Sequence, residues 1–201
     1  MIQTIILDLG KVIIDFDYRR SVEYLLDRWP VDLADIMAIM GDHALLTSYE
    51  TGRISSAEFQ RTVCGLLGVE CSPEEFKQLW GHMFLPVPLV KEELLVALKR
   101  QARLWLLSNT SELHFNFLLE NFPILRHFDQ YILSYQIGAM KPDEKIYRSA
   151  LQIAGSQPDR VFFSDDRAEN VEAALRLGMK AVRFISEDQL RRELVKAGLE
   201  L

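Results

Sequence analysis

MIQTIILDLGKVII, residues 1–14, joins an apolar strand to a carboxylate and a glycine. Residues 4–7 are β-branched or apolar without alternation, which is typical of a strand buried on both faces of a parallel sheet. Asp8 then follows this strand directly. Because ligands of open α/β sheets bind at the carboxyl ends of the strands, Asp8 is the first candidate for a functional residue.

More apolar runs of the same kind follow later in the chain, at residues 104–107, 131–133, 161–163 and 181–185. Helical patterns separate them. The spacing of Val90, Leu94 and Leu98, for example, places three apolar side chains on one face of a helix. Strand alternating with helix predicts an α/β fold, a Rossmann-like, doubly wound core with a mainly parallel sheet.

The segment between the first and second strands has helix signals and almost no strand pattern. Residues 55–58 and 72–75 both match a capping box, S-x-x-E, and the second has proline at the first helical position. We predict an α/β core of residues 1–16 and 85–201 with an inserted all-helical cap of residues 17–84. The paired prolines of residues 85–88, LPVP, disfavour helix and predict a linker that returns the chain to the core.

Composition excludes several function classes. The chain of 201 residues has a formal net charge of −6, so it lacks the basic excess that a nucleic-acid partner requires. No apolar run approaches the ~18 residues of a membrane span, and the N-terminus predicts a strand rather than a signal peptide. Cys64 and Cys71 lack metal-ligand spacing, which favours two free thiols in a reducing compartment. We expect a cytoplasmic protein with no nucleic-acid or membrane partner, and the sequence leaves its oligomeric state open.

The edge of the predicted sheet that carries Asp8 collects further polar residues. They follow the second and fourth strands or lie in a loop between them: Ser108, Asn109, Lys141, Asp165 and Asp166. Each alone is most simply a turn residue or a helix cap. Pro142 is expected to open a helix and to leave Lys141 at its N-terminal edge. Because all of them share one edge, we expect them to form one site.

The residue types at this edge complement one another chemically. Three converging carboxylates would raise one another's pKa values unless a cation held them, and oxygen ligands without His or Cys select Mg²⁺. The Ser108 hydroxyl and the N–H groups after it can hold phosphoryl oxygens, and Lys141 adds a compact positive charge. A nucleophile, a metal, an anion cradle and a cation are the parts that an aspartyl-phosphate route requires.

On these residues the chain resembles the haloacid dehalogenase superfamily over essentially its whole length. The strand ending at Asp8, then Ser108, Lys141 and the acidic pair occur in the order and spacing of that superfamily, and residues 49–55, YETGRIS, resemble a turn common in its caps. The resemblance implies that Asp8 is the catalytic nucleophile and that Lys141 assists it. It implies Mg²⁺ ligands at Asp8, the main-chain carbonyl of Gly10, Asp165 and Asp166, with Asn170 behind them. Phosphate contacts are expected from Ser108, Asn109 and Lys141.

One position departs from the pattern of the superfamily. Most of its phosphatases carry a second Asp two residues after the nucleophile, as general acid and base, and here that position is Gly10. Such help is typically worth ~10²–10⁴-fold in rate. A substrate that needs little of it, such as a sugar 1-phosphate or an acyl phosphate, would explain the loss, and the form Asp8-Leu9-Gly10 resembles a bacterial branch that contains sugar 1-phosphate phosphatases. Asp15 or Asp17 is another source of the proton, although both also suit a helix start.

The favoured prediction is therefore a Mg²⁺-dependent phosphohydrolase of a small phosphorylated metabolite, with a sugar 1-phosphate favoured. Two alternatives stay open. One is a phosphate-binding or regulatory protein of the same superfamily with little turnover. The other is a metal-free enzyme resembling the 2-haloacid dehalogenases, against which the pair Asp165-Asp166 counts, because a metal-free site has no use for it.

Overall fold

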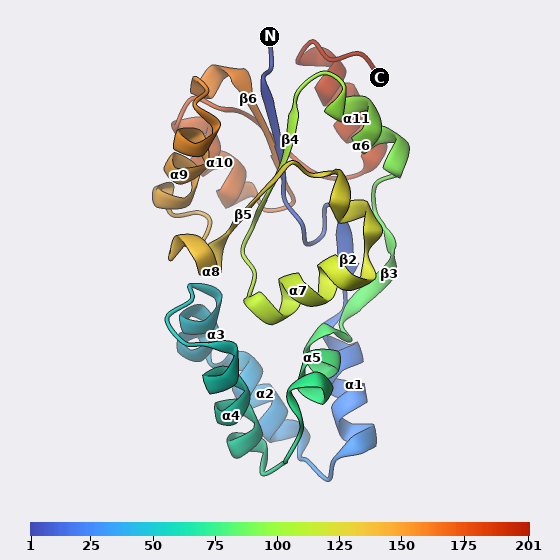
Figure 1. Ribbon diagram of the computed structural model, residues 1–201, viewed down its shortest axis with the longest axis vertical. Helices are drawn as coiled ribbons and strands as arrows, with labels where there is room; N and C mark the ends of the chain where they lie inside the picture. The colour runs from blue at the N-terminus through green and yellow to red at the C-terminus, as the bar shows by residue number, and fades with distance from the viewer.

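A five-stranded parallel sheet forms the centre of the molecule (Figure 1). In the computed structural model, which describes residues 1–201, the strands stand in the order β5-β4-β1-β6-β7, and every neighbouring pair is parallel. Their bounds are β1 Thr4–Leu7, β4 Arg103–Ser108, β5 Gln130–Leu133, β6 Val161–Asp165 and β7 Lys180–Arg183. The strand that precedes Asp8 is thus the central one, and the predicted parallel sheet is confirmed.

Helices cover both faces of this sheet, because successive side chains of each strand point to opposite faces. Ile5 and Leu7 belong to the larger apolar core, which packs against one set of helices, and Ile6 to a second core on the other face. The first set is α6 Glu92–Lys99, α7 Glu112–Asn121 and α11 Glu187–Lys196, and the second is α9 Glu144–Ala154 and α10 Ala168–Arg176 (Figure 1). Short helical turns complete the core, at η1 Pro123–His127, α8 Ser134–Ile137 and η2 Pro158–Arg160. The doubly wound arrangement agrees with the prediction.

A two-stranded antiparallel ribbon carries the chain out of the core and back. It pairs β2 Ile14–Phe16 with β3 Phe84–Pro88. Residues 85–88 thus return the chain to the core without a helix, as predicted, but they do so as a strand, which was not predicted. Both strands of such a ribbon are edge strands, and a proline whose missing N–H would face outward interrupts no ladder there. The two connections to the intervening segment therefore lie side by side.

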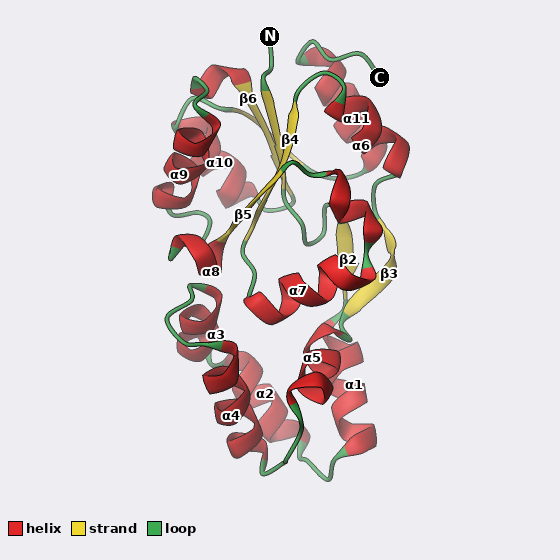
Figure 2. Cartoon of the chain, viewed as in Figure 1, coloured by secondary structure: helices red, strands yellow, loops and turns green.

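Five helices fill the segment between β2 and β3, and they lie beyond the carboxyl ends of the sheet strands (Figure 2). They are α1 Tyr18–Arg28, α2 Leu33–Gly41, α3 His43–Glu50, α4 Ser56–Leu67 and α5 Pro73–Gly81. Both predicted capping boxes are present, at Ser55 with Glu58 and at Ser72 with Glu75. The helices bury an apolar core of their own around Phe59. We call α1–α5 the helical segment; neither its helices nor those of the core have the length and apolarity needed to cross a membrane.

Candidate active site

Asp8 follows the central strand and is largely buried, with 8% of its surface exposed. The N–H of Leu9 donates to Asp8 Oδ1 at 2.7 Å, and Nζ of Lys141 lies 2.6 Å from the same oxygen. The other oxygen, Oδ2, accepts no hydrogen bond from the chain. The protein therefore holds one oxygen of this carboxylate and leaves the second one free.

Lys141 joins the ends of three strands through its ammonium group. Besides its contact with Asp8, Nζ lies 2.6 Å from Asp165 Oδ2 and donates to the carbonyl of Leu107 at 2.9 Å. Burial alone would lower the pKa of Lys141, but the two carboxylates beside it raise the pKa above its ordinary value. The side chain is therefore a fixed positive charge between two buried acids.

The backbone of Lys141 is held by Asn109, which lies just after β4. Asn109 Nδ2 donates to the carbonyl of Lys141 at 2.9 Å, and Asn109 Oδ1 accepts from the N–H of Lys141 at 2.7 Å. The predicted helix start at Pro142 was wrong, because α9 begins at Glu144 with Asp143 as its cap. Lys141 thus stands in a loop that Asn109 braces, and the phosphate contact expected of the Asn109 side chain stays a prediction.

Asp165 ends β6 and is fully buried. Its Oδ1 accepts from the main-chain N–H of Arg167 and from Nδ2 of Asn170, both at 2.9 Å. Oxygens of Asp8, Asp165 and Asp166 all lie within 4.8 Å of one another. The three predicted metal-binding carboxylates are therefore brought together, with Asn170 behind one of them.

The electrostatics of this cluster favour a bound cation. Burial raises the pKa of Asp8 to about 7, with Lys141 opposing the rise and Asp165 adding to it. Burial and the charge of Asp165 also raise the pKa of Asp166. The carbonyl of Gly10 accepts no hydrogen bond within the chain, so it is available as a further oxygen ligand. Hard oxygens without nitrogen or sulfur partners form a donor set that fits Mg²⁺.

Ser108 ends β4 and is buried, and its hydroxyl makes only a long contact of 3.3 Å with the carbonyl of Asn109. The main-chain N–H of Thr110, two residues after Ser108, cannot serve a phosphate, because it already donates to Ser134 Oγ at 2.9 Å. Helix α7 begins only at Glu112, after the cap Ser111. The cradle expected from the N–H groups after Ser108 is therefore smaller than predicted. Ser134 was not predicted, since nothing in its local sequence distinguishes it.

Phe16 occupies the space beside Gly10. A Cβ atom at position 10 would lie 2.9 Å from Cε1 of the Phe16 ring, which is closer than such contacts occur. The neighbouring Lys11 has φ 60°, and its Nζ contacts Asp15 Oδ1 at 2.5 Å and donates to the carbonyl of Phe16 at 2.7 Å. The Phe16 ring and the ion pair of Lys11 with Asp15 thus lie beside the position at which most phosphatases of the resembling superfamily carry a second Asp.

Neither aspartate considered as a replacement is free. The hydrogen bond from Lys11 lowers the pKa of Asp15, which leaves this carboxyl ionised and without a proton to donate near neutral pH. Asp17 is the N-cap of α1, as its helix-start interpretation predicted, and it also pairs with Arg19. Asp15 lies in β2, so its helix-start interpretation was wrong.

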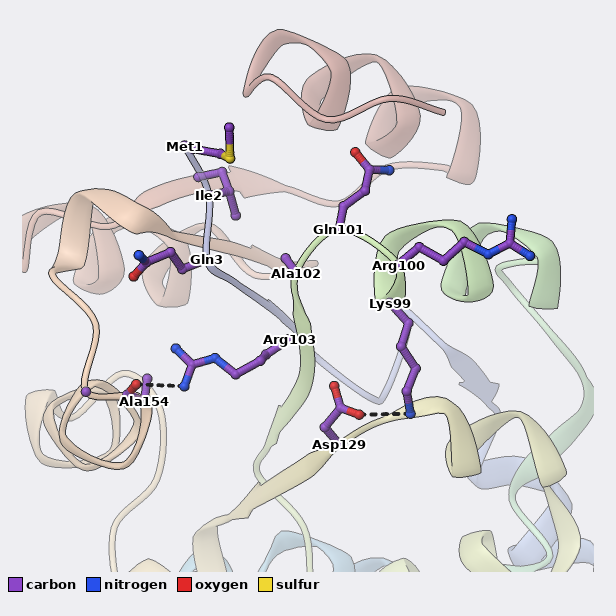
Figure 3. A pocket seen from close by; sticks show the side chains of 11 residues that line it. Met1, Ile2, Gln3, Lys99, Arg100, Gln101, Ala102, Arg103, Asp129 and Ala154 are labelled. Carbon is purple, nitrogen blue, oxygen red and sulfur yellow. Dashed lines mark hydrogen bonds and ion pairs between the residues drawn. The ribbon is translucent and has the colours of Figure 1, made fainter.

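A surface hollow of about 680 Å³ lies at the other end of the sheet strands, around Gln3 and Arg103 (Figure 3). Arg103 Nη1 donates to the carbonyl of Ala154 at 2.9 Å, and Lys99 pairs with Asp129 at 2.8 Å. The hollow sits where β1 and β4 begin, whereas Asp8 stands where β1 ends. It is therefore not part of the candidate site.

Comparison with known proteins gives a family and several relatives. A family model described as haloacid dehalogenase-like hydrolase matches residues 2–178. D-ribitol-5-phosphate phosphatase of Bacteroides thetaiotaomicron is 28% identical over 96% of this chain and 97% of its own length.

Solved structures resemble the whole molecule. The HAD family enzyme BT-2542 of Bacteroides thetaiotaomicron, in complex with magnesium and inorganic phosphate, matches with a TM-score of 0.84 at 26% identity, over 92% of this chain and 96% of its own. A HAD-like family hydrolase from Porphyromonas gingivalis matches with a TM-score of 0.83 at 26% identity, over 100% of both chains.

Proposed function

Because the chain belongs to the haloacid dehalogenase-like hydrolase family, we propose that it is a Mg²⁺-dependent phosphohydrolase of a small phosphorylated molecule. The observation that carries this proposal is the buried contact of Lys141 Nζ with both Asp8 and Asp165, which leaves Asp8 Oδ2 free. The similarity to a ribitol phosphate phosphatase, and to an enzyme that binds magnesium and phosphate, supports the substrate class and the metal.

The metal would be held by Asp8, Asp165, Asp166 and the main-chain carbonyl of Gly10. This assignment rests on the mutual approach of the three carboxylates within 4.8 Å and on the pKa values of Asp8 and Asp166, which burial raises and the charge of Asp165 raises further. When bound, Mg²⁺ would offset the negative charge of the carboxylates and stabilise charge on the phosphoryl oxygens.

Asp8 Oδ2 is the nucleophile in this proposal. It forms a bond to phosphorus while the bond from phosphorus to the leaving oxygen breaks; this gives a phosphoaspartate, and the leaving group departs as an anion that takes any proton it needs from water. Water then attacks phosphorus, and phosphate leaves while the carboxylate of Asp8 is restored. Lys141 holds Oδ1 and so orients Oδ2, and the Ser108 hydroxyl, at the end of β4, would donate to a phosphoryl oxygen.

Residues 17–84 would act as the cap of the core formed by residues 1–16 and 85–201. The helical segment contacts α7 through several polar pairs, among them His114 Nε2 with the carbonyl of Trp80 at 3.0 Å. A cap that rests on the core excludes water from the site, which strengthens every charge interaction inside it.

The leaving group is the finer part of the proposal. With glycine at position 10 and the Asp15 carboxyl held by Lys11, neither of these positions offers an acid for the departing oxygen. An acidic leaving oxygen, as in a sugar 1-phosphate or an acyl phosphate, needs the least help. D-ribitol 5-phosphate, on which the relative acts, is a phosphate of a primary alcohol. Its leaving oxygen is only weakly acidic, so its hydrolysis needs the most help from an acid.

The test is phosphate release from a panel of acyl, anomeric and primary-alcohol phosphates, with and without Mg²⁺. We expect Mg²⁺-dependent turnover that falls at least ~10³-fold in Asp8→Asn, because the amide cannot replace the nucleophile. Asp17→Asn is the matched control, since Asp17 caps α1 outside the cluster, and it should retain most activity. Undiminished turnover in Asp8→Asn would refute the proposal. Tight phosphate binding by the wild-type protein without turnover would favour the alternative of a phosphate-binding or regulatory protein.

A further inference from the structure

A cavity of about 440 Å³ is lined by all five helices of the helical segment and by three residues of the core, His114, Met140 and Arg167. Figure 1 shows the helices of the segment in two groups, α2, α3 and α4 on one side and α1 and α5 on the other. Thirteen of its nineteen lining residues are hydrophobic, and every helix of the segment contributes to them. Its volume is within the range of sites for small organic molecules, and apolar lining is typical of such sites.

The lining of this cavity includes chain neighbours of the candidate active-site residues. Met140 and Arg167 line it from the core, and they are the direct neighbours of Lys141 and Asp166 in the chain. Tyr18 lines it as well, and its ring packs edge-on against Phe16, the residue beside Gly10, at 5.2 Å. If the phosphate of a substrate binds near Asp8, the organic group that carries it can therefore reach the cavity.

Little fixed charge faces this space. Its titratable and charged lining residues are Tyr18, His43, Glu50, His114 and Arg167. Burial lowers the pKa of His114 to about 4, so this imidazole is neutral near neutral pH, and it raises the pKa of Glu50 to about 7, so this carboxyl is only partly ionised there. Arg167 is paired with Glu169. Because hydrophobic residues make up most of the lining, an apolar group would bury more of its surface here than a sugar or polyol would.

We propose that the cavity of the helical segment binds an apolar organic group of the substrate, so that the enzyme acts on a monophosphate carried by a hydrocarbon chain or ring. This inference rests on the proposed phosphohydrolase function and narrows its substrate class. It selects, among phosphates with an acidic leaving oxygen, the aryl or long-chain acyl type over a free sugar 1-phosphate.

The wild-type test uses a series of 4-alkylphenyl phosphates, from methyl to hexyl, with acetyl phosphate as a substrate too small to fill the cavity. The leaving oxygen of the aryl series has nearly constant acidity, so differences within it report on binding of the alkyl group. We expect kcat/KM to rise about fourfold for each added methylene until the cavity is filled. Sugar 1-phosphate and D-ribitol 5-phosphate should rank below the hexyl compound.

A variant test blocks the cavity without touching the carboxylate cluster. Leu46 lines the cavity on α3, and Leu66 is an exposed leucine on α4. Leu46→Trp should lower kcat/KM for the hexyl compound about tenfold or more and leave acetyl phosphate turnover within about twofold. Leu66→Trp, the control for the added indole, should change neither rate.

The outcomes are distinguishable from failure of the proposed function. A flat series alongside good acetyl phosphate turnover would overturn the apolar substrate class and leave the phosphohydrolase standing. A preference for the polar phosphates would do the same. Absence of turnover with every phosphate, acetyl phosphate included, would refute both proposals together.

Discussion

Two donors contact the same oxygen of Asp8, and these contacts fix the orientation of its carboxylate. The Leu9 N–H and the Lys141 ammonium both contact Oδ1, which leaves Oδ2 as the oxygen that would attack phosphorus in the proposed mechanism. Lys141 is itself fixed by Asp165, by a carbonyl of β4 and, through its backbone, by Asn109. A nucleophile whose supports are buried loses little freedom on reaching the transition state.

The residue beside this nucleophile offers a test of the missing acid. Gly10→Asp alone would crowd the Phe16 ring, so the informative variant is Gly10→Asp with Phe16→Leu. If the new carboxyl donates a proton to the leaving oxygen, hydrolysis of D-ribitol 5-phosphate should rise ~10²-fold over Phe16→Leu alone, the lower end of general acid help. Acetyl phosphate hydrolysis should change little, and steady-state phosphate release measures both.

Gly10→Ala with Phe16→Leu is the control, because it adds the same Cβ without a carboxyl. Equal rates for the alanine and aspartate variants, both folded, would contradict the account of position 10.

At the scale of elements, most of the core was predictable because its strands are short apolar runs buried on both faces. The five strands of the sheet follow the predicted runs, and both capping boxes begin helices where predicted. Strand β3 was missed because its two prolines argue against a strand, and only its long-range pairing with β2 reveals it. Local sequence patterns predicted these strands and helix starts, but they did not predict a strand that depends on pairing with a distant segment.

Helix α3 ends at Glu50 and supplies a prediction about pH. Burial raises the pKa of Glu50 to about 7 from an ordinary value of 4.5. Between these values the folded protein binds a proton that the unfolded chain releases, so Glu50 makes the free energy of unfolding fall as pH rises from about 4.5 to 7. Glu50→Gln should therefore be more stable than wild type at pH 8, by on the order of 1–3 kcal/mol after allowance for partial exposure.

Urea unfolding at pH 5 and pH 8 measures this difference. Glu23→Gln, at an exposed position on α1, is the matched control and should show no such pH-dependent gain. A Glu50→Gln variant that tracks wild type at both pH values would show that the carboxyl is solvated in solution.

At the scale of the whole molecule, the β2–β3 ribbon sets the helical segment beyond the carboxyl end of the sheet. At this end of the sheet, residues from four separated parts of the chain lie close together: Asp8, Ser108, Lys141 and the pair Asp165-Asp166. Their convergence was predictable, because parallel strands end at a common edge and each residue follows a strand or lies in a loop there. The brace from Asn109 and the cavity of the segment were not, because both depend on side-chain geometry that no local pattern encodes.

The central claim is that phosphate passes through the carboxylate of Asp8. The most direct measurement is acid quenching during turnover of acetyl phosphate with Mg²⁺, followed by mass analysis of the peptide that contains Asp8. The account predicts a hydroxylamine-sensitive phosphoryl group on Asp8 that disappears in Asp8→Asn. Turnover with no phosphoryl group on this peptide, or with the group on another residue, would contradict it.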